Sequence, residues 1–239
     1  MGEMIWLTAD GVRMQCYTAM PAGGGKHAGI VYLHHQDALD SFTQTYCDNL
    51  AAQGYAVIAP DNYHHSPAEM ERDQKKEELD DTFMANDIAA SVAWLEANPR
   101  VIGDRLAVMG HCMGGRTTYL AVGVHHVFRA AVSWYGGGSL NTRGRPGPSP
   151  YDRMSGIKCP VLGLFGKLDK NPSPEHMAKF DAKLNEGGVP HEFHAYDGAD
   201  HGFCNPHGPR YNEAAAKDSW NRMLGFLAKH LAAKESAVA

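Results

Sequence analysis

The sequence of 239 residues lacks the signatures of several protein classes. It has no run that approaches the roughly 18 consecutive apolar residues of a membrane span. Its first 25 residues do not combine a basic stretch with a long apolar one, so they do not resemble a secretory signal peptide. The net charge of −5, without a block of basic residues, argues against nucleic acid as the main partner. We therefore expect neither a membrane nor a nucleic acid as a partner.

Cysteine is scarce and shows no pairing pattern. The five cysteines are an odd number, are widely spaced and include no C-x-x-C pair. Disulfide frameworks and cysteine-based metal sites show more regular spacing, so we expect reduced thiols and a cytoplasmic location. The sequence leaves the oligomeric state open.

Internal repeats and low-complexity linkers are also absent, and we expect one domain over residues 1–239. Short apolar runs such as residues 29–33 alternate with helical patterns such as residues 41–53 and 82–98. Apolar strands separated by helices indicate a mostly parallel sheet with helices on both faces. The charged segment 69–81 is expected to form a solvated helix.

Residues 107–115 read A-V-M-G-H-C-M-G-G and contain a pattern typical of a catalytic nucleophile. A strand that runs into G-x-nucleophile-x-G and then a helix is the nucleophile elbow of α/β-hydrolases. Glycines suit the pattern because the nucleophile occupies a strained turn whose neighbours approach other backbone closely. The helix N-terminus would favour a thiolate at Cys112. The alternative is a buried structural cysteine.

An acid and a base follow the nucleophile in the chain. Asp169 ends G-L-F-G-K-L-D just past a late strand, and His201 lies in Y-D-G-A-D-H-G-F after the next strand. Nucleophile, acid and then histidine is the order that α/β-hydrolases use. Asp200 is a rival acid because it adjoins His201, but adjacent residues of an extended loop point in different directions. We therefore predict that Cys112, Asp169 and His201 form a catalytic triad.

The histidines at 34 and 35 end a strand that should lie beside the elbow strand. In α/β-hydrolases the loop after that strand supplies one oxyanion-hole N–H, and the residue after the nucleophile supplies the other. We therefore assign the oxyanion hole to the backbone N–H groups of Met113 and Gln36.

Two further histidine pairs, 64–65 and 125–126, stand apart from these motifs. A pair in a strand cannot place both rings on one side, and neither pair has the i, i+4 spacing of a helical zinc motif. We expect these histidines to lie on the surface or in loops, and we expect no metal and no cofactor.

From about residue 14 to 231 the chain resembles the dienelactone hydrolase family, a cysteine branch of the α/β-hydrolases. The resemblance rests on four motifs: Gly110–Gly115, Ala59–Tyr63, Phe165–Asp169 and Ala199–Phe203. It implies an α/β-hydrolase fold with a mostly parallel sheet of about seven or eight strands. It also implies the triad named above and hydrolysis of a small lactone or carboxylic ester through a cysteine acyl-enzyme.

The chain departs from the family pattern at two places. Many members have Leu-His-Glu where this chain has Leu-His34-His35, and that glutamate is thought to share a proton with the resting thiol. Here His35 could accept the thiol proton directly, and His34 is a further candidate for thiol activation or substrate contact. Members specific for dienelactone anchor the substrate carboxylate with arginines. In this chain the next arginine after His201 is Arg210, and Arg72 is a candidate for the other.

Several aromatic and loop residues are candidates for substrate contact. Aromatic candidates for the pocket wall are Tyr63, Trp134, Tyr135 and Phe203, each of which could equally pack in the core. The Gly-, Pro- and Arg-rich segment 141–156 could form a lid whose arginines, Arg143, Arg145 and Arg153, meet an acidic substrate, or it could be an exposed loop. Two other functions stay open: a non-catalytic protein that binds a small molecule, and a metal-assisted hydrolase that uses the clustered histidines.

Overall fold

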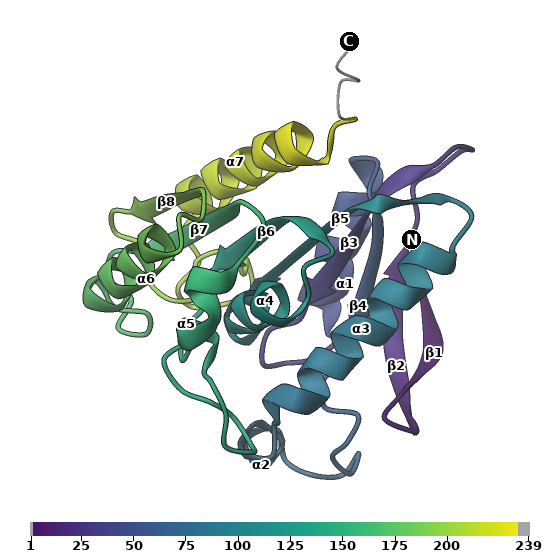
Figure 1. Ribbon diagram of the computed structural model, residues 1–239, viewed down its shortest axis with the longest axis horizontal. Coiled ribbons are helices and arrows are strands. Elements are labelled where there is room, and N and C mark those ends of the chain that lie inside the picture. Colours follow the sequence, from purple (N-terminus) through teal and green to yellow (C-terminus); the bar gives the residue numbers. More distant parts are fainter. Residues whose placement is uncertain (1, 234–239) are drawn as a thin grey trace.

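An eight-stranded sheet forms the centre of the computed structural model, which describes residues 2–233 (Figure 1). The sheet order is β1-β2-β4-β3-β5-β6-β7-β8. Only β2 runs antiparallel to its neighbours β1 and β4, and all the other adjacent pairs are parallel. The strands are β1 (Glu3–Ala9), β2 (Val12–Ala19), β3 (His27–Leu33), β4 (Ala56–Pro60), β5 (Val101–His111), β6 (Phe128–Trp134), β7 (Val161–Gly166) and β8 (His191–Tyr196).

Helices cover both faces of the sheet, as the sequence predicted. They are α1 (Ser41–Ala52), α2 (Arg72–Glu77), α3 (Asp81–Ala97), α4 (Met113–Val124), α5 (Pro150–Arg153), the 3₁₀ helix η1 (Met154–Gly156), α6 (Pro174–Glu186) and α7 (Glu213–Leu231). Within residues 2–233, no helix is long and apolar enough to cross a membrane. The predicted α/β-hydrolase fold is confirmed. The prediction of one domain also includes residue 1 and residues 234–239, which lie outside the described residues.

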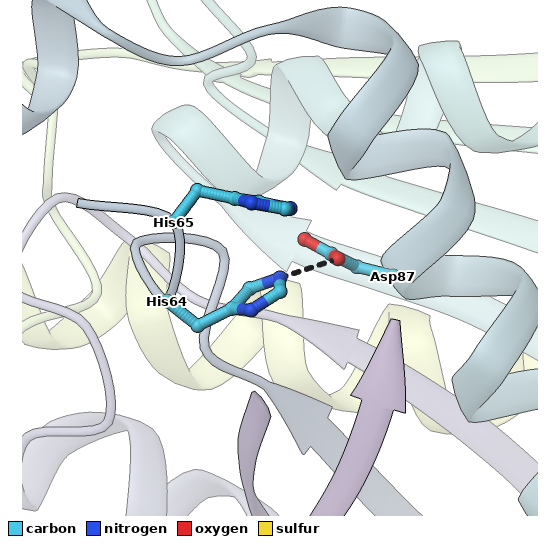
Figure 2. A group of neighbouring side chains, drawn as sticks. All are labelled: His64, His65 and Asp87. Carbon is cyan, nitrogen blue, oxygen red and sulfur yellow. Dashed lines mark hydrogen bonds and ion pairs between the residues drawn. The ribbon is translucent and has the colours of Figure 1, made fainter. Parts of the chain in front are cut away.

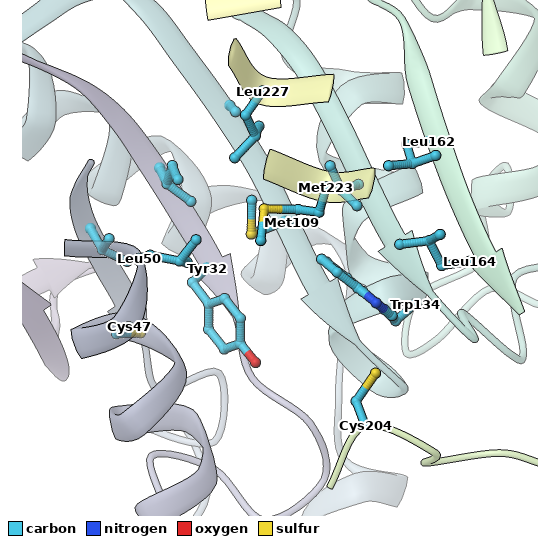
Figure 3. Close-up of a cluster of buried hydrophobic side chains, with 14 of the residues drawn as sticks. Tyr32, Cys47, Leu50, Met109, Trp134, Leu162, Leu164, Cys204, Met223 and Leu227 are labelled. Atoms are coloured by element: carbon cyan, nitrogen blue, oxygen red, sulfur yellow. The ribbon is translucent and has the colours of Figure 1, made fainter. Parts of the chain in front are cut away.

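Side chains of the buried strands alternate between two hydrophobic clusters. Tyr32 of β3 faces the cluster formed with α1 and α7, whereas Val31 faces the cluster formed with α3, α4 and α6. Figure 3 shows the first cluster, in which Met109 of β5 lies among residues that include Leu50 of α1 and Met223 of α7. Burial on both faces explains why these strands read as continuous apolar runs.

Two sequence expectations about connecting segments differ from the structure. The helix expected over residues 69–81 is limited to α2, which has no buried residue and therefore gains nothing from packing. Asp80 instead caps α3 through the backbone N–H of Thr82. The segment 141–156 is not all loop, because α5 begins at a capping box in which Ser149 precedes Pro150.

The fold brings the predicted site residues to one edge of the sheet. In a parallel sheet the carboxyl ends of the strands lie together, and ligands bind in the crevice outside them. The loops that follow β3, β5, β7 and β8 carry His35, Cys112, Asp169 and His201, respectively. Four segments distant in the sequence are therefore neighbours in space.

Replacing Gly114 with alanine tests how closely α4 packs against β3. A Cβ atom at this position would lie 2.6 Å from the carbonyl carbon of Leu33 and closer still to its oxygen. These are backbone atoms that cannot move without disturbing the sheet. We expect Gly114→Ala to lower the free energy of unfolding by about 3 kcal/mol, measured by urea denaturation.

Gly225 of α7 provides a matched control. A Cβ atom there would have no heavy atom within 4 Å. Gly225→Ala should therefore raise stability by about 1 kcal/mol through the higher helix propensity of alanine. Equal unfolding free energies for the two variants would contradict the close packing of α4.

Candidate active site

Cys112 occupies a strained turn between β5 and α4. Its φ of 55° and ψ of −115° lie outside the usual regions for a side-chain-bearing residue. The turn is held on both sides, because the Cys112 N–H donates to Trp134 O at 3.0 Å and the Arg116 N–H donates to Cys112 O at 3.1 Å. The surrounding structure therefore fixes the partly exposed thiol at the N-terminus of α4.

The three residues predicted as a triad are in contact. Nδ1 of His201 lies 2.9 Å from Asp169 Oδ2, and its Nε2 lies 3.0 Å from Cys112 Sγ. Asp169 is almost fully buried, and its other oxygen accepts the backbone N–H of Asn171 at 2.8 Å. The rival acid Asp200 accepts the backbone N–H of His201 at 2.6 Å, so it caps the loop and leaves the ring to Asp169.

The contact between Cys112 and His201 shifts both pKa values toward an ion pair. Burial alone would raise the pKa of Cys112, but the hydrogen bond and charge of His201 and the N–H of Met113 lower it from 9.0. Burial alone would lower the pKa of His201, but its hydrogen bonds to Asp169 and Cys112 raise it from 6.5 to about 10. The arrangement therefore favours a thiolate beside an imidazolium.

The residues assigned to the oxyanion hole lie near the thiol. Met113 is the first residue of α4, a position where the backbone N–H has no partner within the helix. Gln36 and Cys112 line the same cavity. The Tyr63 hydroxyl donates to Gln36 O at 3.1 Å and lies 3.5 Å from Met113 Sδ, so Tyr63 braces both segments. Tyr63 therefore lies behind the cavity wall and supports it.

The adjacent residues His34 and His35 have different surroundings. His34 is fully buried, and its ring bridges His35 O at 2.5 Å and the N–H of Asn62 at 3.0 Å. It braces the loops after β3 and β4 and does not line the cavity. His35 does line the cavity, but its ring lies 3.0 Å from Asp40 and 3.6 Å from Asp37. The thiol itself contacts the ring of His201.

A cavity of about 270 Å³ opens beside Cys112. Of the aromatic candidates, Tyr135 lines it, and its ring centroid lies 5.0 Å from that of His201. Trp134 and Phe203 are fully buried core residues and do not line it; Trp134 is seen in the cluster of Figure 3. The lining residues are His35, Gln36, Asp37, Phe42, Cys112, Tyr135, His201, Gly202, Asn205, Gly208, Pro209 and Arg210.

Arg210 is the arginine that the fold brings to this cavity. Arg72 is half exposed and pairs with Asp37 at 2.7 Å, so it lies behind a lining residue. From the sequence alone, Arg210 is identified only as the next arginine after His201, and Asp37 is not identified as a site residue. Both residues follow the motif histidines closely in the chain, which is the signal that could have identified them.

The arginines of segment 141–156 have separate environments. Arg145 lies over the Phe83 ring, and Arg153 packs against Gly123 of α4. The Arg143 N–H donates to Asp81 at 3.1 Å, which ties the segment to α3. Nη1 of Arg143 is buried and has no hydrogen-bond partner among residues 2–233. After His201 and Met113, the charge of Arg143 also helps to lower the pKa of Cys112.

Two groups of side chains are close enough together to hold a metal ion. One consists of His35, Asp37 and Asp40 at the cavity. The other consists of His64, His65 and Asp87, away from Cys112. As expected, the 64–65 pair lies in a loop. These residues are in a turn and not a strand, so their ring centroids lie only 4.1 Å apart.

Comparisons with known proteins agree on one family. The model of the dienelactone hydrolase family matches residues 14–231. A candidate carboxymethylenebutenolidase of Methylorubrum extorquens is 27% identical over 96% of this chain and 81% of its own length. A candidate 2-oxo-3-(5-oxofuran-2-ylidene)propanoate lactonase of a Bradyrhizobium species is 28% identical over 98% of this chain and 96% of its own. The structure of a candidate dienelactone hydrolase from Klebsiella pneumoniae superposes with a TM-score of 0.86 at 27% identity, covering 96% and 98% of the two chains.

Alkylation of Cys112 as a function of pH tests the ion pair. Because the folded pKa of Cys112 is lowered, the thiolate is present above that pKa and is lost as the pH falls through it. The imidazolium of His201 is lost as the pH rises through about 10. At pH 7 we expect iodoacetamide to modify Cys112 roughly tenfold faster than a peptide cysteine, followed by mass spectrometry.

Two aspartate variants distinguish the roles of Asp169 and Asp200 in this assay. Asp169→Asn should slow alkylation at pH 7 by roughly tenfold, because it removes the charge that stabilises the imidazolium. Asp200→Asn should change the rate little, because Asp200 contacts the backbone of His201. A pH profile that Asp169→Asn leaves unaltered would contradict this electrostatic role.

Proposed function

The chain belongs to the dienelactone hydrolase family, and on that premise we propose that it hydrolyses a small lactone or carboxylic ester through a cysteine acyl-enzyme. The observation that carries the mechanism is the chain of contacts from Asp169 through His201 to Cys112, at 2.9 and 3.0 Å. Cys112 is the nucleophile, His201 the general base and acid, and Asp169 the group that orients the ring.

The first half-reaction forms the acyl-enzyme. The Cys112 thiolate attacks the carbonyl carbon, and the negative charge moves to the carbonyl oxygen. The backbone N–H groups of Met113 and Gln36 donate hydrogen bonds to this oxyanion. When the tetrahedral intermediate collapses, the carbon–oxygen bond to the leaving group breaks. The His201 imidazolium gives its proton to the departing oxygen, so the alcohol leaves neutral; in a lactone it stays attached to the acyl group.

The second half-reaction releases the acid. Neutral His201 takes a proton from water, and the resulting hydroxide attacks the thioester carbonyl. The second tetrahedral intermediate expels Cys112 as a thiolate, which the imidazolium again stabilises. His201 therefore gives up one proton in the first half-reaction and takes one from water in the second, and no other proton carrier is needed.

The replacement of the family glutamate by His35 fits this scheme. Because His201 is 3.0 Å from the thiol and has a raised pKa, it can hold the thiol proton in the resting enzyme. His35, between Asp37 and Asp40, is then a wall of the substrate cavity. We propose that the thiolate here is preformed and does not await substrate binding.

We further propose that the substrate carries a carboxylate. Arg210 lines the cavity, and Arg143 has a buried nitrogen without a partner and a charge that acts on Cys112. A buried guanidinium nitrogen that lacks a partner is costly, and an anionic substrate group would compensate it. The names of the two relatives also describe lactones with a carboxyl-bearing group, carboxymethylene in one and propanoate in the other.

The non-catalytic alternative predicts slow thiol labelling and no turnover. Family membership and the His201 contact both favour an enzyme over a binding protein. A screen of small esters and lactones, with and without a carboxylate, is the direct test of the reaction class.

Cys112→Ala tests the nucleophile. The variant should lose at least about a thousandfold in kcat for p-nitrophenyl acetate, since the base and the acid have nothing left to activate. Cys159→Ala, which removes a buried thiol outside the cavity, should keep the wild-type rate. Intact-mass spectra should show an acyl adduct on wild type and on Cys159→Ala only. Undiminished turnover by Cys112→Ala would falsify the mechanism.

Arginine variants test the substrate class. For an ester that carries a carboxylate, Arg210→Gln and Arg143→Gln should each lower kcat/KM by about tenfold to a hundredfold. For the matching neutral ester the loss should be small. Arg72→Gln should affect both esters alike, because Asp37 already pairs with Arg72. Equal losses on charged and neutral esters for Arg210→Gln would exclude its role in carboxylate binding.

A further inference from the structure

A second group of chemically active side chains lies between the loop after β4 and the first half of α3 (Figure 2). It consists of His64 and His65 from the loop and Asp87 from the helix. One ligand atom from each residue lies within 4.8 Å of the other two. Figure 2 shows the two rings and the carboxylate pointing toward a common space. None of the three residues lines the cavity beside Cys112.

The histidines of this group have unused nitrogen atoms in buried positions. His64 is 3% exposed in its side chain; its Nε2 lies 2.8 Å from Asp87 Oδ1, while its Nδ1 has no hydrogen-bond partner within residues 2–233. Nε2 of His65 is likewise buried and unpartnered there. A buried polar atom without a partner is unfavourable, so the Nε2 atom of His65 calls for an explanation.

The charges of the group are also unbalanced. Asp87 is fully buried, and its direct partners are the Asn62 amide at 2.9 Å and the His64 ring. Asp10, from the turn between β1 and β2, brings a second carboxylate 3.9 Å from His65 Nε2. On the other side, His65 stacks on Phe83, and Arg145 lies beyond that ring. A divalent cation would balance the charges of these two carboxylates beside the two imidazole rings.

We propose that His64, His65 and Asp87 bind a divalent transition-metal ion, with Asp10 available as a fourth ligand. Two imidazoles and one or two carboxylates are the ligand set of many Zn²⁺ sites, and Co²⁺ takes the same ligands. Metal–ligand distances near 2.1 Å place ligand atoms about 3.5 Å apart. Side-chain rotations that move the ligand atoms by about 1 Å would therefore bring all three within bonding distance of one ion. The metal replaces the proton that now joins His64 Nε2 to Asp87, and it gives the buried Nε2 of His65 a partner.

Hydrogen bonds of Asn62 hold the proposed ligands in place. The Asn62 amide bonds the second oxygen of Asp87 and so orients the carboxylate, as outer groups do around metal ligands. The Asn62 N–H also donates to His34, which links this loop to the loop after β3. The metal therefore joins the β4 loop, the β1–β2 turn and α3, and its role is structural and separate from the chemistry at Cys112.

Metal titration of the full-length chain tests this proposal. Cys112→Ala is used as the parent, so that the active-site thiol cannot act as a ligand. We expect Zn²⁺ to bind in one-to-one ratio by calorimetry and to raise Tm, and Co²⁺ to give visible absorption bands of a site with nitrogen and oxygen ligands. Adding His65→Gln should weaken binding by roughly tenfold or more and abolish the Tm shift. Adding His126→Gln, at an exposed histidine outside the group, should change neither.

Two further measurements keep the outcome decisive. Asp40→Asn in the same parent probes the other candidate group, and loss of Zn²⁺ binding there, with binding kept in His65→Gln, overturns the proposal. If His65→Gln does not fold, the ring nitrogen resonances of His64 and His65 are followed in the parent during Zn²⁺ addition. Resonances that both shift support the site, and resonances that stay in place refute it.

Discussion

The close approach of α4 to the carboxyl ends of β3 and β6 is the constraint on which the site depends. Gly114 packs against the backbone of Leu33, and Gly115 packs against that of Trp134, at distances that leave no room for a Cβ atom. This contact forces the chain to turn within one residue between β5 and α4. Cys112 absorbs the turn in its positive φ, and its thiol is thereby held at the helix N-terminus. The conformational strain at Cys112 is sustained by packing on both sides.

Burial and a small number of hydrogen bonds determine the ionisation of Cys112 and His201. Asp169 is buried and bonds one nitrogen of His201, while the other nitrogen faces Cys112. Burial opposes ionisation of both members of the thiol–imidazole pair, and their hydrogen bonds outweigh it. Arg143, whose charge also lowers the pKa of Cys112, has a buried nitrogen without a hydrogen-bond partner among the described residues, which is unfavourable.

Polar networks outside the cavity hold the loops that carry these groups. His34 connects the loop after β3 to Asn62 in the loop after β4, and Asn62 continues the network to Asp87 on α3. On the other side of α3, Asp81 forms a bidentate pair with the fully buried Arg116 of α4 at 2.7 and 2.9 Å. Helix α3 therefore links α4 to the loop after β3.

The sequence by itself determined the sheet class, the elbow and the order of Cys112, Asp169 and His201, because periodicity and glycine spacing are local properties. Only the tertiary structure decided which neighbours a side chain meets. Trp134 and Tyr135 both belong to the core, but Tyr135 also lines the cavity, whereas Trp134 does not. The tertiary structure also brought both rings of the 64–65 pair together, which a rule for strands could not anticipate in a turn. Arg210 lines the cavity and Arg72 does not, because these positions depend on how distant loops fold over one edge of the sheet.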